Sequence, residues 1–363
     1  PSAEISTTMA FYRGAVAWLG GLMTLAQAVY ILGPYQVGGT PNANLRLVQH
    51  ARTETDPRFG LTIRSVLGPY ALLTGICALL LTFARVPAPD ALIVAMSMLS
   101  TNGFMPHTSG ASVLNNTVAE LIMMVFMIVG ATSIVWHRML MERKWTLARE
   151  QSEGMLFITL AMALIAVTAL GSFFVPTSQF AAGRQAFTFA FDAISIFTTT
   201  GITHDRSVGI GLPFELVLLI AFVGGCSYST AGGIKVFRIG TMLQHLGNEL
   251  NRLVYPNALL RDDVQYSEHP RQIAKAVWSA FFLAMLTLTI GILLFALQGA
   301  ELPYAMALAS GSFSQVGNIV NGGLAAFPAG EVPDTALLTI AALSAVARIE
   351  ILVVLAAFAS LKS

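Results

Sequence analysis

The stretch AISIFTTTGITHD, residues 193–205, decides what kind of fold this chain adopts. Three threonines and a glycine follow directly on an apolar run, and both residue types are poor choices for a buried helix. Threonine is stiff at its first side-chain torsion, and glycine loses much conformational entropy when a helix holds it. The stretch therefore predicts a helix that ends here, followed by non-helical backbone.

The composition places this stretch in a membrane protein. The chain has 363 residues, of which 55% are hydrophobic and 11% are charged, whereas a soluble domain carries roughly 25% charged residues. Apolar runs, most of them long enough to cross about 30 Å of hydrocarbon, recur along the chain. We expect an all-α polytopic membrane protein in contact with the lipid bilayer. The runs are 15–33, 65–84, 118–136, 155–175, 213–223, 274–297 and 335–361.

Several other classes of function are disfavoured by the residues. A net charge of +1 gives no bulk attraction to nucleic acid. Cys77 and Cys226 lie in apolar segments without a metal-binding or disulfide spacing. We find no nucleophile–base pair, paired carboxylates or metal-ligand pattern, so we expect neither an enzyme nor a covalently bound cofactor. His204 and Asp205 favour a solvated loop near the outer mouth.

The basic residues give the orientation. Lysine and arginine are concentrated in segments 34–64, 137–153 and 235–275, with Lys362 at the C-terminus. Basic loops stay on the cytoplasmic side of a membrane. We therefore expect these segments to be cytoplasmic and the chain to be multi-pass.

Between the basic segments a pattern repeats three times. Each unit has an apolar helix, a short apolar stretch with a glycine-containing dip, and a second apolar helix, which predicts units at 64–153, 154–270 and 271–363. The middle piece is too short to cross as a helix and return, at about 1.5 Å per residue. We expect a re-entrant half-helix and an extended return in each. Extended backbone at membrane depth must face protein or a water-filled path, so the dips are predicted to line a pore.

These dips carry residues suited to holding a cation. Glycine permits backbone angles that turn carbonyl groups toward an axis, carbonyl rings replace the hydration shell of a monovalent cation, and the negative end of each half-helix dipole faces it. The alternative is that the three dips are ordinary loops between helices. The predicted filter residues are Ser100, Thr101, Asn102, Gly103, Thr199, Thr200, Gly201, Gln315, Val316 and Gly317, with the cation at Thr101, Asn102, Thr199, Thr200 and Val316.

Seven motifs resemble the Trk/Ktr/HKT superfamily of potassium transporters, closest to its TrkH/TrkG-like branch. The resemblance implies four pseudo-symmetric helix–pore loop–helix repeats around one central cation pore, with K⁺ as the transported ion. It also implies potassium uptake across the inner (cytoplasmic) membrane, a homodimer, and a cytosolic nucleotide-binding regulatory subunit of the TrkA/KtrA type. The motifs are WLGG (18–21), STNGF (100–104), FTTTGIT (197–203), GGCSYSTAGGIKVFRI (224–239), YPNALL (255–260), QVGNI (315–319) and ARIEIL (347–352).

The start of the chain departs from the family pattern. Residues 1–63 resemble the second helix of the first repeat plus a cytoplasmic loop, so the outer helix, pore helix and filter strand of that repeat are missing from these 363 residues. We expect an incomplete stretch of a longer protein, or a missing quarter supplied from elsewhere. The missing strand is the one associated in the family with the choice between K⁺ and Na⁺.

The stretch 223–240 should break a membrane helix, because it places four glycines, two serines and a threonine in its middle. The resemblance makes it an intramembrane gate, and Arg348 is expected to hold that loop through its carbonyls. The alternatives are a glycine-rich packing interface, a structural ion pair for Arg348 and a snorkelling Lys235. The expected gate residues are Gly224, Gly225, Cys226, Ser227, Tyr228, Ser229, Thr230, Ala231, Gly232, Gly233, Lys235 and Arg348.

Other transport classes stay open at this point. One is a Na⁺/K⁺ transporter of the same fold, and another is a secondary carrier with broken helices around a midplane site. A non-conducting scaffold is a third. Three dips of one orientation argue against the carrier, which needs an inverted pair of repeats.

Overall fold

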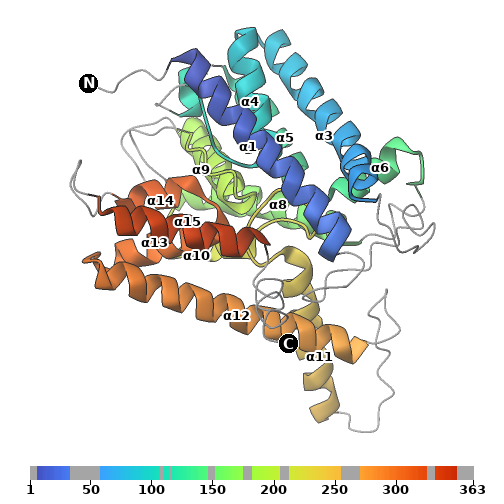
Figure 1. Ribbon diagram of the computed structural model, residues 1–363, viewed down its shortest axis with the longest axis vertical. Coiled ribbons are helices and arrows are strands. Elements are labelled where there is room, and N and C mark those ends of the chain that lie inside the picture. The colour runs from blue at the N-terminus through green and yellow to red at the C-terminus, as the bar shows by residue number, and fades with distance from the viewer. Residues whose placement is uncertain are drawn as a thin grey trace.

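The computed structural model is helical in every element that it describes (Figure 1). Half-helices α4, α9 and α13 occupy its interior, between longer helices on the outside. The described residues are 6–32, 58–106, 110–114, 116–145, 152–174, 182–204, 212–254, 270–324 and 332–349.

Helix α1, Thr7–Gln27, begins where the Ser6 hydroxyl accepts the N–H of Met9 and continues into a π turn, Ala28–Leu32. It packs against α3, Arg58–Phe83, and α4, Ala88–Ser100. A Cβ atom on Gly21 would lie 2.6 Å from the Tyr70 hydroxyl and 3.0 Å from the Ser100 side chain. Glycine at this position therefore lets α1 approach both neighbours closely.

The next helix is sharply bent, where the sequence predicts one continuous helix over 118–136. After a 3₁₀ turn, Ala111–Leu114, α5 runs over Thr117–Ala131 and α6 over Ile134–Met141, at 100° to each other. At the bend, the N–H of Cys226 donates to the Ala131 carbonyl and the N–H of Ile134 donates to the Tyr228 carbonyl. The prediction of one helix is wrong because a distant segment supplies these hydrogen bonds.

The remaining helices follow the predicted order. The return helix after residue 213 is interrupted between Val223 and Val236, as the sequence predicts, and the part of helix 335–361 beyond Ile349 lies outside the described residues. The bounds are α8 Ser152–Gly171, a 3₁₀ turn Ser172–Phe174, α9 Ala182–Phe197, α10 Phe214–Val223, α11 Val236–Val254, α12 Pro270–Leu297, α13 Leu302–Ser314, α14 Gly317–Leu324 and α15 Asp334–Ile349.

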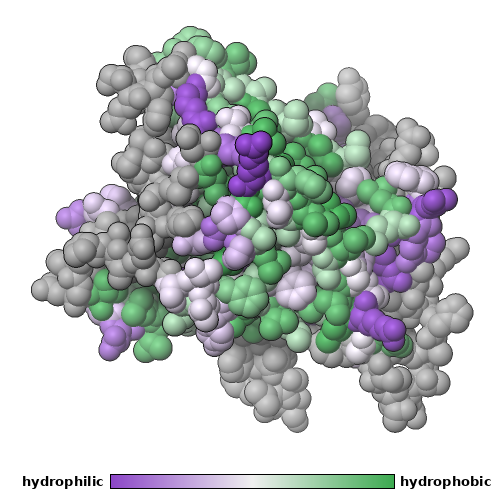
Figure 2. All heavy atoms as spheres, turned by 90° about the horizontal axis from the view of Figure 1, so that it is seen from above, coloured by the Kyte–Doolittle hydropathy of each residue, from purple (hydrophilic) through white to green (hydrophobic). Residues whose placement is uncertain are grey.

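By length and composition, three described helical segments could cross a membrane, and the bent α5–α6 pair would make a fourth. Their outward faces carry large apolar side chains, with Phe83 82% and Leu297 75% exposed. Figure 2 shows apolar side chains over much of one face and hydrophilic residues in separate patches. Such exposure suits a lipid environment rather than water. The three segments are Gly60–Phe83, Glu153–Phe174 and Ile273–Leu297.

The packing of α5 on α4 gives a first prediction. A Cβ atom on Gly130 would lie 2.5 Å from the Met98 carbonyl oxygen, whereas one on Gly75 would meet no atom within 4 Å. Gly130→Ala should lower the free energy of unfolding by ~1–3 kcal/mol through overpacking, seen as a lower melting temperature in detergent. Gly75→Ala is the matched control, and equal stability of the two variants would contradict this packing.

Candidate cation pathway

Each half-helix ends in the same backbone conformation. A residue with a positive φ closely follows each half-helix. Thr101 directly follows α4 with a φ of 49°, Thr199 is the second residue after α9 with a φ of 57°, and Gln315 directly follows α13 with a φ of 63°. Non-glycine residues take this left-handed conformation only rarely. Its recurrence at three matching places shows that the three predicted dips share one local design.

The dips also converge in space. Gly103 and Gly201 have φ values of 71° and 75°. A Cβ atom on Gly103 would lie 2.3 Å from the Thr200 carbonyl oxygen, and one on Gly201 would lie 2.9 Å from the Gly317 nitrogen. Each glycine thus meets the next predicted filter segment, and a side chain at either position would push the two apart.

In the α9 loop, residues 198–204, the peptide N–H groups point back toward the half-helix. Those of Thr200 and Gly201 donate to the Ser195 carbonyl at 2.9 and 3.1 Å, and that of Ile202 donates to the Ser195 hydroxyl at 2.7 Å. The described peptide bonds include no cis bond, so each carbonyl lies opposite the N–H of its own peptide group. The carbonyls of Thr199, Thr200 and Gly201 therefore face away from α9.

The α4 loop, residues 101–106, reaches a similar arrangement by a different side chain. The N–H of Asn102 donates to the Ser97 carbonyl at 3.3 Å. The amide oxygen of Asn102 then accepts the Ser97 hydroxyl at 3.0 Å and the N–H of Phe104 at 2.8 Å. The Asn102 amide oxygen thus accepts a backbone N–H of this loop, as the Ser195 hydroxyl does in the α9 loop.

The extended return predicted after α13 is wrong. Helix α14 begins at Gly317, directly after the turn Gln315–Val316, and the Val316 carbonyl accepts the N–H of Val320 at 3.3 Å. The Gln315 amide nitrogen donates to the carbonyls of Ser312 and Ser344 at 3.2 and 2.9 Å. Helical hydrogen bonding thus resumes at Gly317, although QVGNIVNGG contains three glycines.

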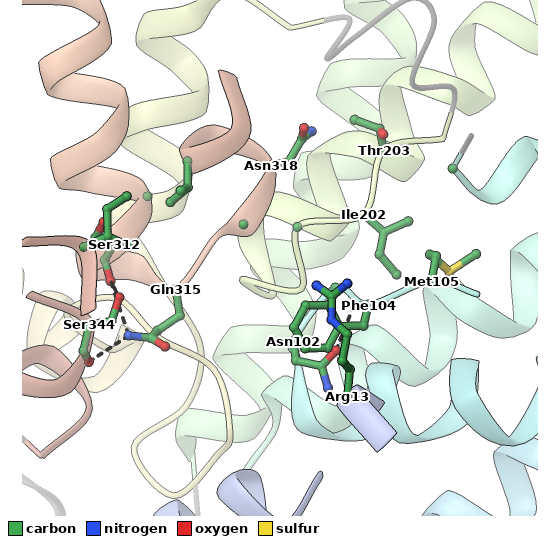
Figure 3. A pocket seen from close by; sticks show the side chains of 17 residues that line it. Arg13, Asn102, Phe104, Met105, Ile202, Thr203, Ser312, Gln315, Asn318 and Ser344 are labelled. Carbon is green, nitrogen blue, oxygen red and sulfur yellow. Dashed lines mark hydrogen bonds between the residues drawn. The ribbon is translucent and has the colours of Figure 1, made fainter. Parts of the chain in front are cut away.

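A cavity of about 650 Å³ lies where the three segments meet. Figure 3 shows Asn102, Ile202 and Asn318 around it, from three different half-helix units. Arg13, from α1, lies with its guanidinium carbon 4.5 Å from the centre of the Phe104 ring. Arg13 was not predicted as a lining residue, because the sequence indicates only that it lies on the non-cytoplasmic side.

The break between α10 and α11, residues 224–235, folds back on itself. The N–H groups of Ile234 and Lys235 donate to the carbonyls of Phe222 and Val223, both at 3.0 Å. A Cβ atom on Gly224 would lie 2.1 Å from the Gly232 carbonyl oxygen. These glycines therefore permit the close approach of the two arms of the loop.

The break touches the C-terminal end of every half-helix. The Thr230 hydroxyl donates to the Leu99 carbonyl at 2.8 Å and lies 3.3 Å from the Thr101 hydroxyl. The N–H of Gly232 donates to the Thr199 hydroxyl at 2.7 Å, and a Cβ atom on Gly232 would lie 2.1 Å from the Ser314 carbonyl oxygen. The predicted gate residues and the predicted filter residues are thus hydrogen-bonded neighbours.

Two cationic side chains bind carbonyls of this break. Arg348, on α15, donates to the Thr230 carbonyl, one of the carbonyls expected as its partners. The Lys235 ammonium donates to the Ala231 carbonyl within the same segment. Lys235 is therefore engaged with the loop, and the snorkelling interpretation does not describe it.

Glu153 is a site residue that the sequence analysis missed. Its carboxylate, in the first turn of α8, accepts the N–H of Ser227 at 2.7 Å and the Ser227 hydroxyl at 3.0 Å. The break is thus bound at Ser227 by Glu153 and at Thr230 by Arg348. The sequence shows a carboxylate at the start of an apolar helix, but a carboxylate in that position equally indicates the end of a loop.

The outer end of the α9 loop is buried. His204 is 1% exposed and Asp192 is 1% exposed. The expectation of a solvated loop is therefore wrong for His204, while Asp205 lies outside the described residues. Within the described ranges, no cluster of His, Cys, Asp and Glu residues is suited to hold a metal ion.

Comparisons with known proteins agree with this architecture. The family profile of the cation transport protein TrkH matches residues 2–363. The chain is 30% identical over 296 residues to the Trk system potassium uptake protein TrkH of Salmonella typhimurium, covering 80% of the chain. Because that match covers 61% of the Salmonella protein, the chain spans less than two thirds of this relative.

Two further relatives are matched over more of their length. The chain is 30% identical over 356 residues to the Trk system potassium uptake protein TrkH of Halomonas elongata, covering 96% of the chain and 72% of that protein. The crystal structure of the potassium transporter TrkH from Vibrio parahaemolyticus matches with a TM-score of 0.81 at 26% identity. That match covers 97% of this chain and 72% of the other.

The contacts of Glu153 give a second prediction. Glu153→Ala leaves a buried Ser227 N–H without its acceptor, at a cost of about 1–3 kcal/mol. We expect faster amide exchange over residues 224–235, measured by hydrogen–deuterium exchange and mass spectrometry. Amide exchange over residues 224–235 should be slower in Glu153→Gln, which keeps an acceptor oxygen, than in the alanine variant.

The control for this variant is Glu142→Ala. Glu142 follows α6, and hydrogen bonds from Lys144 and Arg138 hold its pKa below its usual range. It is a hydrogen-bonded carboxylate, as Glu153 is, but it lies away from the break. Equal exchange of residues 224–235 in both alanine variants would show that Glu153 does not hold the break.

Proposed function

Because this chain belongs to the TrkH family of cation transport proteins, we propose that it forms part of the path by which potassium ions enter the cell. Its relatives are named potassium uptake proteins. The activity is permeation rather than catalysis, K⁺ is the transported ion, and the cell inner membrane is the location. The predicted division into units at residues 64–153, 154–270 and 271–363 is part of this proposal.

One observation carries the proposal: three half-helix ends meet around one cavity. The contacts between Gly103 and Thr200, and between Gly201 and Gly317, join the three segments, and about 650 Å³ of space lies beside them. Half-helices aim the negative ends of their dipoles at such a space. A cation that sheds water there gains carbonyl oxygens in exchange.

The filter ligands are proposed from the hydrogen bonding. The N–H groups bound to Ser195 and Ser97 turn the carbonyls of Thr101, Thr199 and Thr200 away from their half-helices. The N–H of Phe104, which donates to the Asn102 side chain, turns the Gly103 carbonyl in the same way. Asn102 stays in the proposed set through its place between Thr101 and Gly103. Val316 has less support than these residues, because its carbonyl accepts an N–H of α14.

The break at 224–235 is proposed as the gate. It lies against Thr101, Thr199 and Ser314, at the three half-helix ends, so an ion leaving the filter would meet it. Arg348 holds Thr230 and places a positive charge beside the path. Movement of the break would have to exchange these hydrogen bonds for others.

We also propose a homodimer and a cytosolic nucleotide-binding regulatory subunit of the TrkA/KtrA type. Segment 241–272, which is polar enough for a cytoplasmic surface, is where we propose that such a subunit docks. It begins on α11, which projects from the helices around it (Figure 1). Apolar side chains on α11 are exposed and available to a partner. They are Leu243 at 64%, Leu246 at 49%, Leu250 at 54% and Leu253 at 81% exposure.

Uptake of ⁸⁶Rb⁺ by liposomes that contain the purified protein tests the function. We expect uptake above that of protein-free liposomes, reduced by K⁺ at lower concentrations than by Na⁺. Equal competition by the two ions would favour the alternative, a Na⁺/K⁺ transporter of the same fold. Uptake no greater than that of empty liposomes would overturn the proposal.

The filter glycines give a third prediction. Gly103→Ser and Gly201→Ser should lower the preference for K⁺ over Na⁺ at least threefold, because each added Cβ would clash with backbone atoms of the next filter segment. The measure is the ratio of Na⁺ to K⁺ concentrations that halve ⁸⁶Rb⁺ uptake. Gly299→Ser is the matched control, since Gly299 also has a positive φ, 93°, but no atom lies within 4 Å of its Cβ position. An unchanged ratio in both filter variants would remove these loops from the filter.

The gate gives a fourth prediction. Shortening residues 226–231, or Arg348→Ala, should raise ⁸⁶Rb⁺ uptake severalfold, because either change loosens the contacts that hold the break beneath the filter. Arg138→Ala, which removes an exposed arginine paired with Glu142, should leave uptake unchanged. Folded variants with wild-type or lower uptake would argue against a gate at this place.

A further inference from the structure

A buried polar cluster lies at the outer end of the α9 loop, beyond the predicted filter residues. Glu120, in the first turn of α5, is 0% exposed, and its carboxylate accepts both terminal nitrogens of Arg184 at 3.1 Å. The Nε2 atom of His204 lies 3.3 Å from the same carboxylate. A fully buried carboxylate is costly to keep unless charged and polar partners surround it.

His204 is held by contacts from several directions. Its N–H donates to the Asp192 carboxylate at 2.8 Å, its carbonyl accepts the N–H of Ser112 at 2.8 Å, and its Nδ1 atom lies 3.3 Å from the Thr188 hydroxyl. The imidazole also packs edge-on against Phe187 and Phe191. His204 therefore fixes the loop in position only three residues after Gly201.

The anchors of this cluster come from two neighbouring units. Asp192 and Arg184 belong to α9, which precedes the loop, whereas Glu120 belongs to α5 and Ser112 to the turn before it. Ala111 adds a second backbone bond across the units, with its N–H donating to the Thr203 carbonyl at 3.2 Å. The outer end of one filter loop is thus attached to the adjacent unit.

We propose that Glu120 is a positioning residue for ion selectivity. Through His204 and Arg184 it holds the outer end of the α9 loop, and the hydrogen bonds to Ser195 hold its inner end. The carbonyls of Thr199, Thr200 and Gly201 lie between these two attachments. Selectivity for a larger cation depends on the number and position of such carbonyls, so loosening the outer attachment lets the loop adapt to Na⁺. This inference rests on the proposed function.

The test is ⁸⁶Rb⁺ uptake competed by K⁺ and by Na⁺ for Glu120→Gln, which removes the charge with little change of shape. We expect the Na⁺-to-K⁺ ratio of half-inhibiting concentrations to fall at least threefold while uptake persists. Glu120→Asp, which keeps the carboxylate, should recover part of the ratio. Glu142→Gln removes a paired surface carboxylate and should match the wild type.

A purely structural role predicts a different result. Folded Glu120→Gln protein with reduced uptake but the wild-type ratio would overturn the inference. Should Glu120→Gln fail to fold, Arg184→Gln replaces it, because the Arg184 side chain is 34% exposed and its replacement is easier to tolerate. The Na⁺-to-K⁺ ratio of half-inhibiting concentrations should also fall in Arg184→Gln. An unchanged ratio would equally overturn the inference. A wild type without K⁺-sensitive uptake would instead count against the proposed function.

Discussion

The structure depends on how non-helical backbone is satisfied at membrane depth. In hydrocarbon each unpaired N–H or C=O group costs several kcal/mol, yet the loops after α4 and α9 and the break before α11 all leave the helical conformation. They satisfy one another: Thr230 reaches Leu99 and Gly130, Gly232 reaches Thr199, and Tyr228 reaches the bend at Ile134. Because these segments share hydrogen bonds, the proposed filter and the proposed gate are parts of one polar core surrounded by apolar helices.

The same requirement explains the placement of charge. Buried ionised groups are retained when they are paired or hydrogen-bonded. Glu153 and Arg348 bind the break at Ser227 and Thr230, and Glu120, paired with Arg184, lies beside His204 at the outer end of the α9 loop. Each contacts backbone, or a residue within such a segment, instead of forming an isolated ion pair. The charges therefore fix the positions of the segments that have no helix to hold them.

Much of this was predictable because it follows from local chemistry. The run of three threonines and a glycine at 198–201 ends helix α9, and the four glycines of 224–233 break the return helix. The errors came from long-range contacts. The α5–α6 bend depends on hydrogen bonds with Cys226 and Tyr228. The roles of Glu153 and His204 depend on partners at least twelve residues away in the sequence. The helix that begins at Gly317 was not predicted because its sequence resembles the other dips.

Crystals soaked in Rb⁺ would test the central claim most directly, because Rb⁺ scatters anomalously and stands in for K⁺. The account predicts an anomalous peak in the cavity beside Gly103 and Gly201, in direct contact with the Thr199 and Thr200 carbonyls and displaced by excess K⁺. A structure with Rb⁺ bound only elsewhere, or with those carbonyls turned toward α9, would contradict a carbonyl-lined cation pathway at this place.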